Sequence, residues 1–537
     1  MEPELILGTR EASRILEPEP ASKTGHPQLE GERVAIIVNH GMGQQVPYQT
    51  IEGVANAVWR GAGQAASRSV VRRVRLGIQG EDDVETELVR AEIQIQHEQH
   101  KFDVHIYEAY WAPLTEGKVT LKDVMFFLFD AGWNGFMNTE IGTFKRWMFD
   151  SEQKFKLARW RLNAILLFLV LLLMSLVFMN AVLAAAVASH AIGGSNAFPG
   201  TLTAPLTYDF IIADFAAILI ALGTLGLPWL YKKLTKSPGI PKWLSWLGWI
   251  LILPAAFLIV FAGWAMPFQL AGYDPENHIW RWLACRAQCL TLGHEVWTTL
   301  LWALELLAAY TARWFLVEYV GDVTAYIAAH TVSKFYDLRQ QIWQTAMKVA
   351  RAVYRAQPEQ AGANQSSFFY DKIIMVGHSL GSVLGYDVLN GLFLEDALSK
   401  GPLQIAERTC MFLTFGSPLD KTAFLFRTQG DMRSAVREVA AAAVQPMIQN
   451  YDNRPLEWVN LYSKSDVISG NLDYYDPPNR HNARNKTPWQ NPATAPVAHE
   501  RAVKNLVDPD ARTPLAAHVE YWTGELFANE LVRAITR

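Results

Sequence analysis

Cysteine is scarce in this sequence. Cys285, Cys289 and Cys410 are the only three among 537 residues, too few for a disulfide framework. Cys285 and Cys289 lie four residues apart, and we favour two unpaired thiols over a local disulfide or a metal pair. No cluster of His and Cys has the spacing of zinc ligands. We therefore expect no metal site and no organic cofactor.

Charge is also low. Charged residues make up 19% of the chain and hydrophobic residues 50%, whereas soluble domains carry about 25% charged residues. The formal net charge of −4 gives no general attraction to nucleic acid, so we expect no nucleic-acid partner. The acidic N-terminus lacks a basic start followed by an apolar run, and we predict no secretory signal peptide. Residues 1–30 are typical of a disordered tail.

Two parts of the chain have the patterns of an α/β protein. In residues 31–143, a buried strand is predicted at 34–38, a helix at 50–65, and alternating strands at 70–78, 88–96 and 102–110. In residues 321–537, helices are predicted at 331–356 and 380–394, and strands at 371–376, 411–415 and 458–462. Neither part has enough strands alone. We therefore predict one mostly parallel sheet, covered on both faces and split by an insertion.

The insertion, residues 144–320, is apolar. Four segments are candidates to cross the ~30 Å core of a bilayer: 162–189, 210–231, 243–268 and, more weakly, 297–319. The third segment has tryptophans near both ends, as interfacial anchors do. The first segment follows a group of basic residues, namely Lys145, Arg146, Lys154, Lys156, Arg159 and Arg161. By the positive-inside rule we expect the N-terminal part to be cytoplasmic.

The number of crossings must be even if the two α/β parts share one sheet. We favour four crossings, and the alternative is two crossings with a further segment lying in the interface. We expect a multi-pass protein of a bacterial inner membrane with its α/β domain in the cytoplasm. Asp214 and Glu305 fall within the apolar segments. Acids inside a membrane hint at transport, but a position near a span end or a bundle-facing side chain explains them as well.

The chemistry centres on the segment Gly377-His378-Ser379-Leu380-Gly381. A strand, Gly-x-Ser-x-Gly and a helix form the nucleophile elbow, a turn so tight that Gly377 and Gly381 must lack bulky side chains. The turn would lift the Ser379 hydroxyl above the sheet edge, and the N–H of Leu380 would face a developing oxyanion. His378 should point away from that hydroxyl.

A serine nucleophile needs a base and an acid, which follow it in the order acid, then His, in this fold. The later histidines are His481, His499 and His518, and we favour His518 because it precedes the last helical stretch. Asp466 follows the strand at 458–462 closely and is our choice of acid.

Three other acids are candidates for the residue that supports the histidine. Asp420 is the runner-up, and Asp473 and Asp476 fit loop-capping roles better.

A second oxyanion donor is expected from the loop after the first strand, Asn39-His40-Gly41-Met42-Gly43. Glycines let a backbone approach a substrate closely. The N–H of Met42 is our choice and that of Gln44 the second, against the alternative of a simple glycine turn.

These residues resemble those of fungal-type triacylglycerol lipases, within the α/β-hydrolase superfamily. The resemblance is carried by Gly-His-Ser-Leu-Gly, Phe415-Gly416-Ser417-Pro418, the pair Val459-Asn460 followed by Asp466-Val467-Ile468, and His518-Val519-Glu520-Tyr521-Trp522. It implies triad roles for Asp466 and His518, and His40-Gly41 is similar to the oxyanion segment of many esterases. The match covers the α/β parts alone.

The sequence therefore predicts a membrane-embedded serine hydrolase that cleaves lipid or acyl esters through an acyl-serine intermediate. Acyltransferase or thioesterase chemistry at the same serine is one alternative. A membrane scaffold or transporter that kept a hydrolase fold is another.

Overall fold

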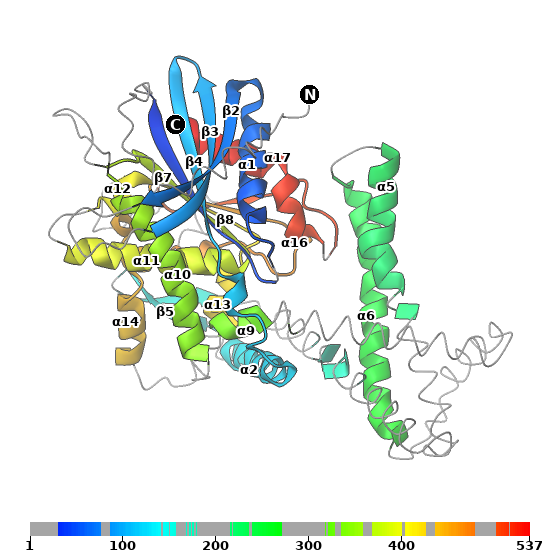
Figure 1. The fold of residues 1–537 in the computed structure, drawn as a ribbon. Helices are drawn as coiled ribbons and strands as arrows, with labels where there is room; N and C mark the ends of the chain where they lie inside the picture. Colours follow the sequence, from blue (N-terminus) through cyan, green and yellow to red (C-terminus); the bar gives the residue numbers. More distant parts are fainter. Residues whose placement is uncertain are drawn as a thin grey trace, which may run out of the picture.

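A computed structural model describes most of the two α/β parts and some of the insertion. The described residues are 31–43, 45–76, 86–140, 143–149, 151–156, 168, 171–172, 174–176, 179, 215–216, 218–235, 239–270, 317, 321–327, 335–357, 368–399, 403–425, 435–477, 501–514 and 516–537. Within these ranges the strands form one eight-stranded sheet and one two-stranded sheet. Helices lie against both faces of the larger sheet (Figure 1).

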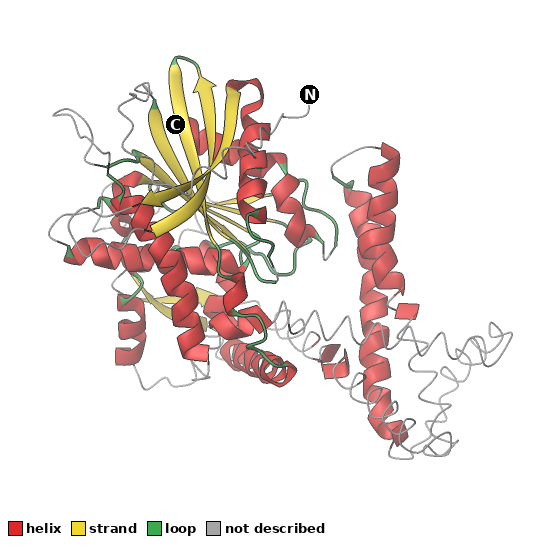
Figure 2. Ribbon diagram, viewed as in Figure 1, coloured by secondary structure: helices red, strands yellow, loops and turns green. Residues whose placement is uncertain are grey.

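The large sheet has the strand order β10-β9-β8-β7-β1-β4-β3-β2. Figure 2 draws its strands in yellow. Neighbours from β10 to β4 pair in parallel, whereas β3 and β2 are antiparallel. The chain is thus an α/β protein with a mostly parallel mixed sheet, and strands from both α/β parts of the sequence contribute to it. The strands are β1 (Glu32–Asn39), β2 (Ala66–Leu76), β3 (Thr86–His97), β4 (His100–Ala109), β7 (Lys372–His378), β8 (Thr409–Phe415), β9 (Trp458–Tyr462) and β10 (Val503–Val507).

Strand β1 shows why the sheet is covered twice. Successive side chains of a strand point to opposite faces. Val34, Ile36 and Val38 join an apolar cluster with helices α1 (Gln49–Ala62) and α17 (Glu525–Thr536). Ala35 and Ile37 join a second cluster with α10 (Tyr336–Arg355) and α11 (Leu380–Leu398). The continuous apolar run is therefore the pattern of a central parallel strand that is buried on both faces.

The α/β parts contain seven further helices among the described residues. They are α2 (Leu121–Glu140), α9 (Gly321–Ile327), α12 (Ile405–Arg408), α13 (Leu419–Leu425), α14 (Ala435–Ala443), α15 (Pro446–Gln449) and α16 (Ala517–Glu520). The sequence patterns located α10 and α11 within a few residues, but they did not predict α2 or β10.

A small β-hairpin lies where the predicted insertion begins. Strands β5 (Thr143–Met148) and β6 (Ser151–Lys156) pair with each other, and the N–H of Phe149 donates to the carbonyl of Ile448. Arg146 is buried against the rings of Tyr474 and Tyr475. The hairpin therefore packs on the C-terminal α/β part, and Arg146, one of the basic residues before the first predicted span, is buried there.

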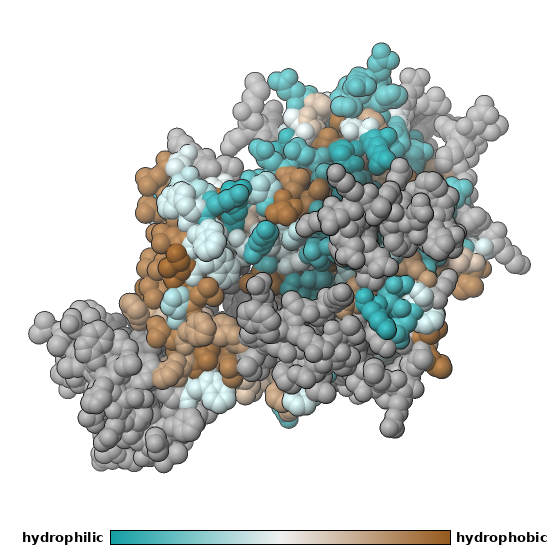
Figure 3. Space-filling model, turned by 180° about the vertical axis from the view of Figure 1, so that it is seen from behind, coloured by the Kyte–Doolittle hydropathy of each residue, from teal (hydrophilic) through white to brown (hydrophobic). Residues whose placement is uncertain are grey.

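Helices α5 (Leu227–Thr235) and α6 (Lys242–Leu270) belong to the insertion. Among the described residues, one helix, Lys242–Trp264, is long and apolar enough to cross a membrane. Large hydrophobic side chains on both helices are exposed, including Trp246 at 72% and Leu234 at 75%, and they form a hydrophobic surface beside a more hydrophilic body (Figure 3).

Small residues join the apolar helices. An added Cβ at Gly248 would lie 2.9 Å from the carbonyl oxygen of Gly223. Ser175 contacts Gly263 and donates to the carbonyl of Val260. Such contacts are typical of helices packed in membranes. The predicted spans at 162–189 and 297–319, with Glu305, lie largely outside the described residues, as do Asp214, Cys285 and Cys289.

A buried ion pair secures the segment before β9, and it gives a first prediction. Arg454 and Asp476 are fully buried and 2.8 Å apart. Asp476→Ala should lower the free energy of unfolding by about 3 kcal/mol, because it leaves a buried guanidinium without its carboxylate. Denaturant titration followed by tryptophan fluorescence measures the loss. The exposed Asp452 provides the control, and equal effects of Asp452→Ala and Asp476→Ala would contradict this role.

Candidate active site

Ser379 lies on a strained turn between β7 and α11. It is the residue before the first turn of α11 and has φ 52°, a conformation that L-residues rarely adopt. Its N–H donates to the carbonyl of Phe415 at the end of β8. The turn thus has the strand-turn-helix geometry of a nucleophile elbow at the carboxyl edge of the parallel strands.

The two glycines of the elbow are required by close contacts. A Cβ at Gly377 would lie 2.5 Å from the Cα of Ser382, and a Cβ at Gly381 would lie 2.1 Å from the carbonyl oxygen of Asn39. Real Cβ atoms do not approach so closely. Gly381 therefore lets α11 begin directly against the end of β1.

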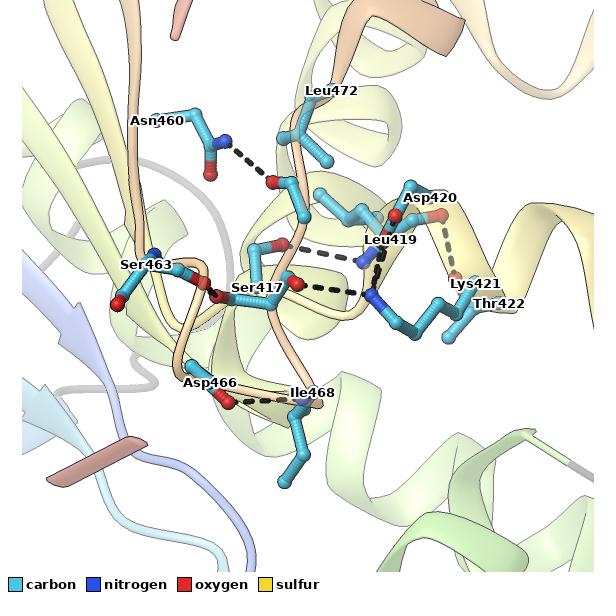
Figure 4. Close-up of polar contacts among 12 residues, drawn as sticks. Ser417, Leu419, Asp420, Lys421, Thr422, Asn460, Ser463, Asp466, Ile468 and Leu472 are labelled. Atoms are coloured by element: carbon cyan, nitrogen blue, oxygen red, sulfur yellow. Dashed lines mark hydrogen bonds and ion pairs between the residues drawn. The ribbon is translucent and has the colours of Figure 1, made fainter. Parts of the chain in front are cut away.

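Asp466 and His518 meet near this edge. The Nδ1 of His518 lies 3.0 Å from the Oδ2 of Asp466 and must donate, because a carboxylate accepts only. Asp466 also accepts from the N–H of Ile468, as Figure 4 shows, and from the hydroxyl of Tyr521. The donation from Nδ1 leaves Nε2 of a neutral His518 free to accept a proton.

The charge of Asp466 is strongly favoured. Burial raises the pKa of this carboxyl, but the hydrogen bond and charge of His518, with the donors Ile468 and Tyr521, outweigh burial and lower the pKa to about 2. The carboxylate is therefore ionised at neutral pH and can stabilise a charged imidazole.

Ser379 and His518 are not joined by a hydrogen bond. Within the described part of the chain, neither the Ser379 hydroxyl nor the Nε2 of His518 has a hydrogen-bond partner, although both atoms are buried. Bonds between a nucleophile and its base often tighten only when substrate binds. The structure thus brings together acid and base, and leaves the last bond of the predicted triad open.

His378 forms a hydrogen bond with the backbone of His518, the candidate base. Its Nε2 lies 3.0 Å from the carbonyl oxygen of His518 and must donate to it. Burial, with the neighbouring charge of His518, lowers the pKa of His378 to about 3. His378 is therefore a neutral imidazole that binds His518 through the main chain, as expected of a side chain not directed at the Ser379 hydroxyl.

The loop after β1 lies against the elbow. A Cβ at Gly41 would be 3.0 Å from the Cβ of Ser379. Among the described residues, neither the N–H of Met42 nor that of Leu380 donates a hydrogen bond, and the first N–H groups of a helix have no intrahelical partner. Both groups are available for an oxyanion. Gln44, the second choice, lies outside the described residues.

The imidazole of His40 supports this loop. It stacks on Trp111 with ring centroids 4.5 Å apart, and its Nε2 accepts from the N–H of Trp111. Its Nδ1 donates to the carbonyl of Gly41. Burial lowers the pKa of His40 to about 4, against the opposing effect of that hydrogen bond. His40 is thus a neutral brace for Gly41.

The other acids considered are engaged elsewhere. Asp420 lies beside Gly470 and binds Lys421 (Figure 4). Asp473 accepts from the side chain of Asn505. Asp476 accepts from the N–H of Val503, as a loop-capping residue does, and also pairs with the buried Arg454. His481 and His499 lie outside the described residues.

Two supporting residues were not anticipated from the sequence. Tyr521 follows His518 by three residues, a helical spacing that brings both onto Asp466. Asp322 accepts from the N–H of Gly43 at 2.7 Å. The helical spacing could have indicated Tyr521, whereas no local pattern links Asp322 to a loop so distant in the chain.

Within the described ranges, no three His, Cys, Asp or Glu side chains gather as metal ligands would. No family model, no curated protein and no solved structure matched the chain.

The buried, neutral histidines predict a pH-dependent stability. Below pH 6.5 the unfolded chain binds protons at His378, whereas the folded chain does not until about pH 3. The stability that follows from keeping His378 neutral is therefore fully present above pH 6.5 and is lost as the pH falls toward 3. Between pH 6.5 and 5, the free energy of unfolding should fall by about 2 kcal/mol less in His378→Gln than in wild type.

Urea unfolding of the full chain in detergent at both pH values measures this difference. His100→Gln is the control, because His100 is exposed at the start of β4. If His378→Gln and wild type lose equal stability over this pH range, His378 is not the neutral, buried group described here.

Proposed function

We propose that this chain is a membrane-embedded serine hydrolase of the α/β-hydrolase kind, which cleaves lipid or acyl esters through an acyl-serine intermediate. The observation that carries the proposal is the meeting of four segments, distant in the chain, at one sheet edge. Ser379 lies on a strained turn, His518 is bonded to Asp466 at 3.0 Å, and Gly41 lies against Ser379. The chain order Ser, Asp, His is that of α/β-hydrolases.

The proposed reaction begins with proton transfer. Nε2 of His518 takes the hydroxyl proton of Ser379 while the serine oxygen bonds to the acyl carbon of the ester. The electron pair of the carbonyl bond moves onto the carbonyl oxygen. The N–H groups of Met42 and Leu380 stabilise that oxyanion. The ester C–O bond then breaks, and the alcohol leaves with the proton from His518. Water repeats the sequence and releases the acid.

The apolar helices support a lipid as the substrate. Trp243 and Trp246 are exposed at the start of α6, beside Ser245, which donates to the carbonyl of Arg512 in the loop before His518. Exposed tryptophans next to basic residues such as Lys242 are typical of the membrane surface. A bilayer placed at that level would present its ester groups near His518.

The same contact supports an even number of crossings. The turn between α5 and α6 lies on the C-terminal α/β part, so the segments before it must return the chain to that side. We propose that 162–189 and 210–231 cross as one pair and that 243–268 and 297–319 cross as a second. A reporter fused after Arg286 should then be active on the far side of the membrane, and cytoplasmic activity there would exclude four crossings.

Loss of the nucleophile provides the direct test of the proposed activity. Ser379→Ala should lower kcat for a p-nitrophenyl ester by about 10⁴-fold or more, and Asp466→Asn by a comparable factor, because both act in the same step. Initial rates of the purified full chain in nanodiscs measure these losses. Ser151→Ala, an exposed serine, is the control. Wild-type activity in Ser379→Ala would refute the assignment.

Product analysis separates hydrolysis from acyl transfer. With a short alcohol added, we expect the free acid to remain the main product, because water completes the second half of the reaction. A product that is mostly the new ester would favour an acyltransferase at the same serine.

A further inference from the structure

Helices α5 and α6, which we call the apolar hairpin, contact the segment that carries the candidate base. We call residues 508–514 and 516–520 the base segment; it runs from β10 to the end of α16. Ser245 of α6 donates to the carbonyl of Arg512 at 2.8 Å, and Arg512 donates to the carbonyl of Ile240. A Cβ at Gly248 would lie 3.0 Å from the ring of Pro514. The hairpin and the base segment therefore share a close, partly polar interface.

One carboxylate joins the parts of this interface. Glu520 Oε2 accepts from the N–H groups of Arg512 and Thr513, at 3.0 and 2.9 Å. Its Oε1 accepts from the Thr513 hydroxyl and from the ammonium of Lys232 in α5, the latter at 2.7 Å. The side chain of Glu520 is 13% exposed and that of Lys232 is 34% exposed. Glu520 thus closes the base segment on itself and ties it to the apolar hairpin.

The position of Glu520 connects this contact to the chemistry. It lies two residues after His518 in the short helix α16, so that the two move together. The other restraints on His518 are Asp466 at its ring and His378 at its carbonyl. A base displaced by about 1 Å can lose about 100-fold in rate. Release of α16 from the hairpin would therefore be felt at Nε2.

We propose that Glu520 and Lys232 are positioning residues, through which the apolar hairpin holds His518, the candidate base, against Ser379. The inference rests on the proposed function, since it concerns the orientation of His518 during ester cleavage. Lys232 adds a hydrogen bond between two charged groups, which is about twice as strong as a bond between neutral groups. The apolar insertion is then a part of the active site's support as well as an anchor.

The test compares two adjacent lysines in the full chain, reconstituted in nanodiscs. Lys232→Met should lower kcat for a p-nitrophenyl ester about tenfold with KM within about twofold, because it misplaces the base without altering substrate contacts. Lys232→Arg should restore most of the rate. Lys233→Met is the matched control, since Lys233 is exposed and contacts the ring of Trp229. Glu520→Gln should behave as Lys232→Met does.

The outcomes separate this inference from the proposed function. If wild type is active while Lys232→Met and Lys233→Met have the same kcat, the positioning role is overturned and the proposed function stands. A changed KM with an unchanged kcat overturns it too. A wild type that cleaves no ester overturns the proposed function, and this inference with it. Melting temperatures of all variants within a few degrees of wild type are expected, because Lys232 is a third exposed.

Discussion

The parallel pairing of β1 with β7 is the contact on which the candidate site depends. Asn39, the last residue of β1, lies opposite Gly377 of the elbow, although more than half of the chain separates them. The pairing brings the loop after β1 to Ser379 and leaves so little space that Gly381 meets the carbonyl oxygen of Asn39. The candidate site therefore combines residues from both α/β parts of the chain.

Electrostatics then selects one imidazole among three. His40 and His378 are buried, bind backbone groups and have lowered pKa values, so they remain neutral at physiological pH. Only His518 faces an ionised carboxylate, that of Asp466. The environment, rather than proximity to Ser379, thus distinguishes the candidate base His518 from the other two histidines. A proton taken by His518 is stabilised by Asp466, whereas a proton on His378 would have no comparable partner.

Local patterns predicted what is local. The apolar run of β1, the helix-breaking glycines around Ser379, and the chain order of Asp466 and His518 can be read without coordinates. The missed features depend on distant partners: β10 pairs with β9, Arg146 is buried under Tyr474 and Tyr475, and Asp322 reaches Gly43. Arg146 shows the difficulty most clearly, since a basic residue before an apolar span has the same sequence pattern whether it faces lipid headgroups or aromatic rings.

We propose above all that Ser379 is an activated nucleophile. Its most direct test treats the folded, full-length chain with a serine-directed fluorophosphonate and locates the adduct by peptide mass spectrometry. The site described here predicts a phosphonyl group on Ser379, because Nε2 of His518 can accept the hydroxyl proton as the serine oxygen attacks. An unmodified Ser379 in folded protein, under conditions where an added serine hydrolase reacts fully, would contradict it.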